Sequence, residues 1–148
     1  MYRWMLIFHG AWRWLVILAG IAAVANALNG LRRHASWEPL GPRLGRLFGI
    51  AVDIEVLTGA VLYLVLSPLT SGEAGELTYA APGSEKAFFS GRHALTMLAA
   101  LFAVHIASVL TRRGRGDAAH QRRAALFYGL TLLIVLSAVP WWRPLLRL

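Results

Sequence analysis

Two histidines lie within or beside long apolar stretches of the sequence, where a polar side chain needs a partner inside the protein. His9 belongs to FHGAWRWLVILAGIAAVANAL, and His93 directly precedes ALTMLAALFAV. Arg13 follows His9 by four residues and Met97 follows His93 by four, so each pair shares one face of a helix. Imidazole and thioether groups bind metal ions, and imidazole is an axial ligand of haem iron. These four residues are the first candidates for a cofactor site.

A second polar pair is formed by Asp53 and His105, which fall in the inner halves of two apolar segments. Ionisable groups inside a bilayer are costly and almost always face the interior of the helix bundle. We therefore expect the two side chains to contact each other or to share one water, either as a proton-accepting pair or as a buried structural pair. Glu55 lies about 200° around the helix from Asp53, so the two carboxylates cannot face one partner, and the role of Glu55 stays open.

The elements that must position these residues are four apolar segments, at about 4–28, 44–66, 87–110 and 124–139. The chain has 148 residues, of which 57% are hydrophobic and 15% charged. Each segment is near or above the ~17–25 residues that cross a bilayer as a helix. The sequence therefore predicts an all-α, integral membrane, antiparallel four-helix bundle that forms a single domain over residues 1–148.

Two features of the composition narrow this prediction. The first segment could be a signal peptide, but Arg13 interrupts it and it exceeds the usual apolar core of ~7–15 residues, so we expect a retained helix. The chain has no cysteine, which excludes disulfides and thiolate metal sites.

Arginine predicts the orientation of the bundle. Nine of the fifteen Lys and Arg residues lie in or beside the first and third loops, namely Arg32, Arg33, Arg43, Arg46, Arg112, Arg113, Arg115, Arg122 and Arg123. Short basic loops stay in the cytoplasm, so both termini are expected to be periplasmic. The net charge of +8 then indicates topology and anionic lipid head groups rather than nucleic acid. An aromatic belt is expected at the outer face, formed by Trp4, Trp12, Trp14, Trp141 and Trp142.

Depth along the helices brings His9 and His93 together. Each lies about one turn below the outer start of its helix, counted at ~1.5 Å per residue. Two imidazoles on facing helices of a four-helix bundle can hold a b-type haem between them. One haem is favoured over two, because the inner site offers only His105 beside Asp53. The haem carboxylates would pair with Arg13, Arg92 or Arg3, and the rings expected to pack on the haem are Trp12, Trp14, Phe89 and Phe102. Without such a carboxylate, Arg13 would need one from the middle loop or the carbonyls of a helix end.

Short motifs along nearly the whole chain resemble a group of small bacterial membrane proteins with four helices that are labelled cytochrome b-like, or cytochrome b561-like. The group shares LH-S/G-x-x-RW in its first helix, matched here by Phe8-His9-Gly10 and Arg13-Trp14. Its second helix carries a histidine six residues before a glycine and then G-x-x-LY…SP. This chain has Asp53 at the histidine position and keeps Gly59, Leu62, Tyr63, Ser67 and Pro68. The group's H-x-x-x-M and PW are matched by His93, Met97, Pro140 and Trp141. The resemblance implies a haem protein of the bacterial inner membrane, while Asp53 speaks against a second haem.

Three functions follow as hypotheses. The first is a membrane haem protein that passes electrons to or from quinol or a redox protein, with His9 and His93 as ligands. The second is a copper-handling or transport protein that uses His9, His93 and Met97. The third is a non-catalytic accessory or assembly subunit whose polar residues only lock the helices together. A homo-oligomer and a subunit of a larger complex are both compatible with this sequence.

Overall fold

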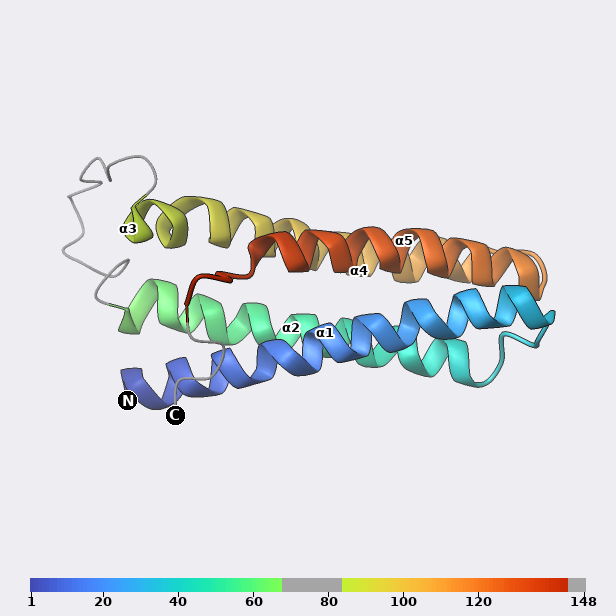
Figure 1. The fold of residues 1–148 in the computed structure, drawn as a ribbon, viewed down its shortest axis with the longest axis horizontal. Coiled ribbons are helices and arrows are strands. Elements are labelled where there is room, and N and C mark those ends of the chain that lie inside the picture. Colours follow the sequence, from blue (N-terminus) through green and yellow to red (C-terminus); the bar gives the residue numbers. More distant parts are fainter. Residues whose placement is uncertain (68–83, 144–148) are drawn as a thin grey trace.

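The computed structural model of the chain describes residues 1–67 and 84–143. Four rods lie side by side (Figure 1). The first is α1, Tyr2–Arg33, and the second is α2, Leu40–Val61, continued by the π-helix η1, Leu62–Leu66. The third is the short α3, Glu85–Ala87, continued by the π-helix η2, Phe88–His93, and by α4, Ala94–Arg112. The fourth is α5, Asp117–Ala138.

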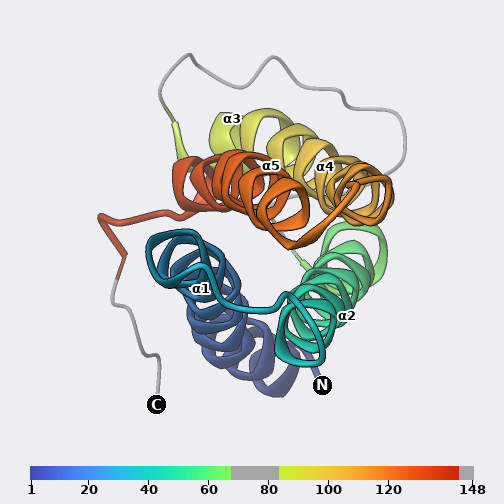
Figure 2. The same ribbon diagram turned by 90° about the vertical axis from the view of Figure 1, so that its right-hand side faces the viewer.

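The rods alternate in direction, so the described part of the chain is an antiparallel, all-helical bundle (Figures 1 and 2). Most helix ends reach beyond the apolar segments, because polar residues at the boundary continue the helix into the loops. The helix expected at 4–28 spans Tyr2–Arg33, and the one expected at 124–139 begins at Asp117. Pro68 and the middle-loop residues Glu73 and Glu76 lie outside the described residues.

Three of the rods are long and apolar enough to cross a membrane: Tyr2–Arg33, Leu40–Leu66 and Glu85–Arg112. The fourth rod, α5, is not among them. Its first two turns carry Asp117, His120, Arg122 and Arg123. Only the segment from Ala124 onward is therefore apolar enough for the hydrocarbon core of a bilayer. α5 nevertheless packs beside α1 and α4 as the fourth member of the bundle (Figure 2).

Apolar side chains fill the centre of the bundle and also cover its outside. Val16, Val52, Val104 and Val135 are almost fully buried, one from each rod. Many larger apolar side chains point outward, including Leu18, Leu57, Phe102, Leu126 and Leu133. An outer surface of this kind fits contact with the acyl chains of a bilayer, which identifies a membrane protein.

The two ends of the bundle are built differently. We call the end where α1 begins the site end, and the end where α1 finishes the closed end. At the closed end the helices approach closely, because glycines stand opposite large side chains. A methyl group added at Gly45 would overlap the Tyr128 hydroxyl, and one added at Gly41 would overlap the Trp37 ring.

Hydrogen bonds tie the connections at the closed end to the bundle. Asp117 Oδ1 accepts from the Trp37 backbone N–H at 3.0 Å, and the Gln121 side-chain amide donates to the Ala35 carbonyl at 2.6 Å. These bonds hold the connection between α1 and α2 against the start of α5 and satisfy backbone groups that the turn leaves unpaired.

Candidate functional site

Two neighbouring cavities open at the site end, with volumes of about 120 Å³ and 430 Å³. Both are bordered by the side chains of His9, Glu55, Phe89, His93 and Met97. The larger volume falls within the ~300–1,000 Å³ typical of cofactor and small-molecule pockets. The two cavities therefore define one candidate site between α1, α2, the third rod and the end of α5.

The His9 imidazole is held by two groups of α2. Its Nδ1 lies 3.2 Å from Thr58 Oγ1 and 3.4 Å from the Glu55 carboxylate. The Thr58 hydroxyl hydrogen is directed to the α2 backbone, at 2.9 Å from the Ile54 carbonyl and 3.0 Å from the Glu55 carbonyl. Thr58 Oγ1 can then only accept from the ring, and this hydrogen bond assigns the ring proton of His9 to Nδ1. The lone pair of His9 is left on Nε2.

The His93 imidazole is fixed in the same way by a helix end. His93 is the last residue of η2, and its Nδ1 donates to the Ala138 carbonyl at 2.9 Å. α5 ends at Ala138, where the final carbonyls lack partners within the helix, so this acceptor is available. A carbonyl cannot donate, which assigns the proton of His93 to Nδ1 and its lone pair to Nε2.

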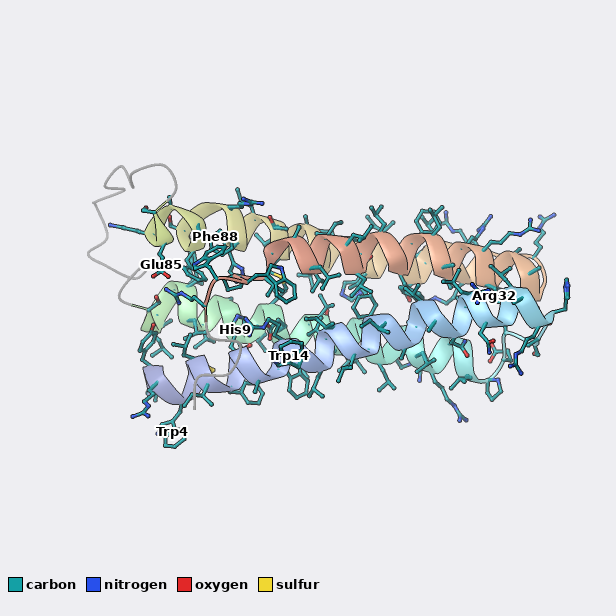
Figure 3. The ribbon with its side chains drawn as sticks, viewed as in Figure 1. Trp4, His9, Trp14, Arg32, Glu85 and Phe88 are labelled. Carbon is teal, nitrogen blue, oxygen red and sulfur yellow. The ribbon has the colours of Figure 1, made fainter. Side chains whose placement is uncertain are left out.

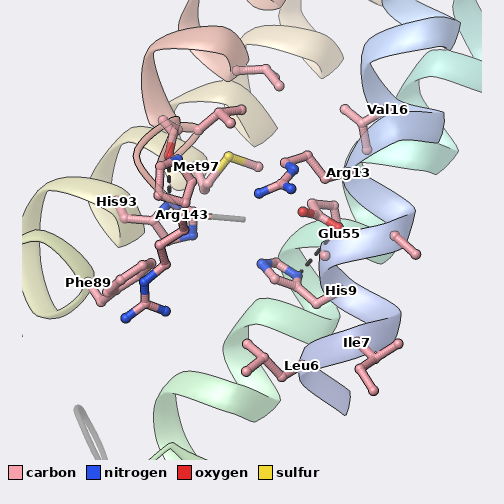
Figure 4. A pocket seen from close by; sticks show the side chains of 16 residues that line it. Leu6, Ile7, His9, Arg13, Val16, Glu55, Phe89, His93, Met97 and Arg143 are labelled. Atoms are coloured by element: carbon pink, nitrogen blue, oxygen red, sulfur yellow. Dashed lines mark hydrogen bonds and ion pairs between the residues drawn. The ribbon is translucent and has the colours of Figure 1, made fainter. Parts of the chain in front are cut away.

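The two rings lie opposite one another, as predicted from their depths. Their centroids are 6.3 Å apart and their planes are nearly perpendicular, at 88° (Figure 4). Metal–imidazole bonds of about 2 Å on opposite sides of one ion would place ring centroids roughly 6 Å apart. Ligand histidines almost always donate their other ring N–H to a fixed acceptor. Here His93 donates to the Ala138 carbonyl, and His9 donates to the Thr58 hydroxyl oxygen with the Glu55 carboxyl group 3.4 Å away. The His9 and His93 side chains therefore fit a haem iron that both would hold through Nε2.

Glu55 and Arg13 complete the wall between α1 and α2. Glu55 is buried, with 4% of its surface exposed, and its carboxylate interacts with His9 and with the positive charge of Arg13 (Figure 4). Arg13 turns inward and lines the smaller cavity. Among the described residues, its positive charge interacts with the carboxyl group of Glu55 on α2. A buried charge is tolerated when it is paired in this way.

The segment that follows α5 packs against the start of the third rod at the site end. Arg143 donates two hydrogen bonds to the Glu85 carboxylate, at 2.8 Å and 2.6 Å, and its guanidinium lies 4.3 Å from the centre of the Phe89 ring. These hydrogen bonds raise the pKa of Arg143 above its ordinary value. Trp142 packs edge-on against Phe88 at 4.6 Å between centroids. The segment thus brings a second cation to the cavities, both of which Arg143 lines.

Several expected neighbours of the site lie elsewhere. Trp14 does not line either cavity; its ring is 5.9 Å from the Arg13 guanidinium (Figure 3). Trp12 donates to the Ala51 carbonyl at 3.0 Å, and Phe102 is 65% exposed on the outside of α4. Phe89 lines both cavities as expected. The arginines expected beside the haem carboxylates, Arg3 and Arg92, are exposed and line neither cavity.

Asp53 and His105 contact each other, but on the outside of the bundle. His105 Nε2 lies 2.9 Å from Asp53 Oδ1, and the side chains are 59% and 44% exposed, respectively. Asp53 directly follows the buried Val52, and His105 directly follows the buried Val104. Each side chain is therefore turned about 100° away from the core. The predicted contact between the two side chains is confirmed, but the expectation that they face the interior of the bundle is wrong.

Two further observations bear on the choice of ligand. Across residues 1–67 and 84–143, there is no group of three or more His, Cys, Asp or Glu side chains placed to hold a metal ion. The chain matches no protein-family model, no curated protein and no solved structure. The resemblance to cytochrome b-like proteins thus depends on the motifs quoted above, and the site is interpreted from its own geometry.

The sequence did not identify Glu55, Thr58, Gly59 or Arg143 as part of the site. The spacing of three and four residues from Glu55 to Thr58 and Gly59 places all three on one helix face, which was a usable signal. Gly59 matters because a methyl group there would lie 3.2 Å from His9 Cε1. Arg143 carried no such signal, since its position depends on how the chain turns after α5.

Proposed function

We propose that this protein is a membrane-embedded b-type haem protein for electron transfer, with His9 and His93 as the two axial ligands of one haem. The observation that carries the proposal is that the two imidazoles have the same hydrogen-bonding arrangement. Each is held through Nδ1 by a fixed acceptor, and each keeps the lone pair of Nε2 for a ligand between the rings. A structural histidine needs only the first of these properties.

The chain's own residues would perform three tasks at this site. Glu55 and Thr58 orient His9 and increase its basicity as a ligand, and the Ala138 carbonyl does the same for His93. Arg13 and Arg143 supply positive charge for the two carboxylates of the group. Met97 and Phe89 provide apolar surface that keeps water away. When bound, haem supplies an iron centre that cycles between ferric and ferrous states.

Two imidazole ligands favour electron transfer over the binding of gases. With both axial positions filled, the iron would have no open site for oxygen. The reduction potential would be set by the ligands, their hydrogen-bond acceptors and the apolar surroundings. The partner is a quinol or a redox protein that approaches the site end.

The distribution of charge supports an orientation in which the site end lies at the periplasmic face of a bacterial inner membrane. The arginine-rich connections after α1 and α4 lie at the closed end, at the far end of α1 from His9, where Figure 3 shows Arg32. By the distribution of Lys and Arg, that end is cytoplasmic and both termini are periplasmic. Trp4, which points away from the bundle at 75% exposure, then lies at the level of the outer lipid head groups (Figure 3).

A copper-binding protein is the second candidate, favoured by one observation. The Met97 side chain lines both cavities together with His9 and His93, so a thioether is available beside two imidazoles. Haem remains the better account because it needs only the two facing nitrogens and makes use of a cavity of about 430 Å³. A protein that binds neither would be an accessory or assembly subunit.

Histidine variants test the proposal directly. The full-length protein is expressed with ample haem, purified in detergent and examined by absorption spectroscopy and by metal analysis. We expect His9→Ala and His93→Ala each to lose the low-spin spectrum, and His105→Ala and His120→Ala to keep it, with helical circular dichroism unchanged in all four. A low-spin spectrum that survives His9→Ala or His93→Ala would contradict the ligand assignment. Stoichiometric copper without haem would favour the second candidate.

A further inference from the structure

The Asp53–His105 pair bridges the outer seam between α2 and α4, in a surface that is otherwise apolar. On α2 it is preceded by Ile50 and followed by Leu57, which are 47% and 65% exposed. On α4 the exposed side chains one turn before and after His105 are Phe102 and Val109, at 65% and 43%. Exposed apolar side chains therefore lie on both sides of the pair along each helix, and the pair lies within the membrane-spanning part of the bundle.

The pair keeps unused hydrogen-bonding capacity at this depth. Its one hydrogen bond joins His105 Nε2 to Asp53 Oδ1. Among the described residues, His105 Nδ1 and Asp53 Oδ2 have no hydrogen-bond partner. Acyl chains offer neither donors nor acceptors, so exposing these atoms to lipid is costly. A protein surface with a matching donor and acceptor would remove that cost.

We propose that this face, formed by α2 and α4 around Asp53 and His105, is the interface of a two-fold symmetric dimer of this chain. A two-fold axis at the seam presents to each pair the same pair of the other copy. With His105 as an imidazolium and Asp53 as a carboxylate, each unused Nδ1–H can donate to the unused carboxylate oxygen opposite. Such self-complementarity is what a two-fold interface requires, and two-fold dimers are the commonest oligomers. Polar side chains join helices in membranes in this way.

A second feature of the same face allows close approach. Gly49 precedes Asp53 by one helical turn, and a methyl group added there would meet no atom within 4 Å. It therefore has no packing role within the monomer, unlike Gly45 at the closed end. Small residues beside a polar one let two membrane helices come close enough for hydrogen bonds. The dimer is independent of any cofactor at the site end.

Cross-linking of the full chain in liposomes tests the proposal. The sequence has no cysteine, so Ile106→Cys on the proposed face and Leu133→Cys on the outside of α5 give matched single-thiol proteins, 56% and 64% exposed at the substituted side chains. A short bis-maleimide should convert Ile106→Cys to a covalent dimer and leave Leu133→Cys monomeric. Equal cross-linking of the two proteins, or none at either, would overturn the proposal.

A second measurement tests the polar pair itself. The variant D53L/H105L replaces two outward-facing side chains and leaves the core unchanged. Loss of the two symmetry-related contacts should weaken dimerisation about tenfold, followed by energy transfer between labelled chains as lipid dilutes them. An unchanged dissociation constant would overturn the role of the pair. Energy transfer that is absent from the unsubstituted protein at every dilution would overturn the dimer.

Discussion

At the site end two imidazoles face one another across a cavity, whereas at the closed end the imidazole of His120 lies flat against Trp37, with 6.0 Å between ring centroids. His120 also donates from Nδ1 to a carbonyl, that of Thr111, at 2.8 Å. A hydrogen bond that fixes the ring is thus common to both ends. What differs is the surface opposite the ring, which is a second imidazole and a cavity at one end and a tryptophan at the other.

Glycines on α2 also differ in their surroundings between the two ends of the bundle. Gly45 brings α2 against Tyr128 at the closed end, while Gly59 leaves room for the edge of His9 at the site end. Tight contacts hold the helices together at the closed end, whereas cavities lie between the helices at the site end. The comparison teaches that polar residues in a membrane bundle indicate a ligand site only where the helices do not close over them.

The largest effect is expected from removing the charge of Glu55. Glu55→Gln keeps the size of the side chain and an acceptor oxygen, but it replaces the ionisable carboxyl group beside His9 and Arg13 by an amide that cannot carry charge. Changes in the groups that hold a ligand histidine typically cost about 10–100-fold in affinity. We expect that loss in a haem titration of the purified protein.

Asp53→Asn is the matched control for this prediction. It makes the same chemical change two residues away on the opposite, outer face of α2. It should leave haem affinity unchanged. Equal losses of affinity in the two variants would contradict the claim that Glu55 acts through its position on the inner face of α2.

A smaller effect is expected from filling the closed end. Gly45→Ala adds a methyl group that overlaps the Tyr128 hydroxyl, and overpacking of this kind costs about 1–3 kcal/mol, partly offset by the higher helix propensity of alanine. Gly129→Ala on α5 adds the same group in open space, away from the face formed by α2 and α4, and should stabilise the helix by up to about 1 kcal/mol. Unfolding in mixed micelles by added denaturing detergent measures both. Equal stabilities would mean that the closed end is not tightly packed.

The smallest effect is expected from breaking the ion pair between Arg143 and Glu85 at the site end. Arg143→Gln removes the ion pair with Glu85, whose side chain is 51% exposed, so the loss of stability should not exceed about 1 kcal/mol. Because the folded state raises the pKa of Arg143, the guanidinium contribution is complete below its unfolded pKa and declines only as pH rises through the folded value. Stability measured from pH 6 to pH 9 should therefore show no step assigned to this arginine. A step in that range that disappears in Arg143→Gln would contradict the assignment.

The sequence predicted the helices well because length and hydropathy alone decide them in a bilayer. It also predicted that His9 and His93 lie at one depth, since rise per residue converts position into depth. It failed where rotation about the helix axis matters: Asp53 faces outward and Glu55 inward, although both lie on α2 two residues apart. Apolar residues on every side of a membrane helix hide the face that packs, so depth could be predicted and direction could not.

One absorption measurement tests the central claim, that His9 and His93 hold a single haem between them. The unsubstituted full-length protein, expressed with ample haem and purified in detergent, is recorded in the oxidised and reduced states, and its haem and protein contents are determined. The account predicts one haem per chain and the spectrum of a six-coordinate, low-spin iron with two imidazole ligands. A colourless protein, a five-coordinate high-spin spectrum or two haems per chain would contradict it.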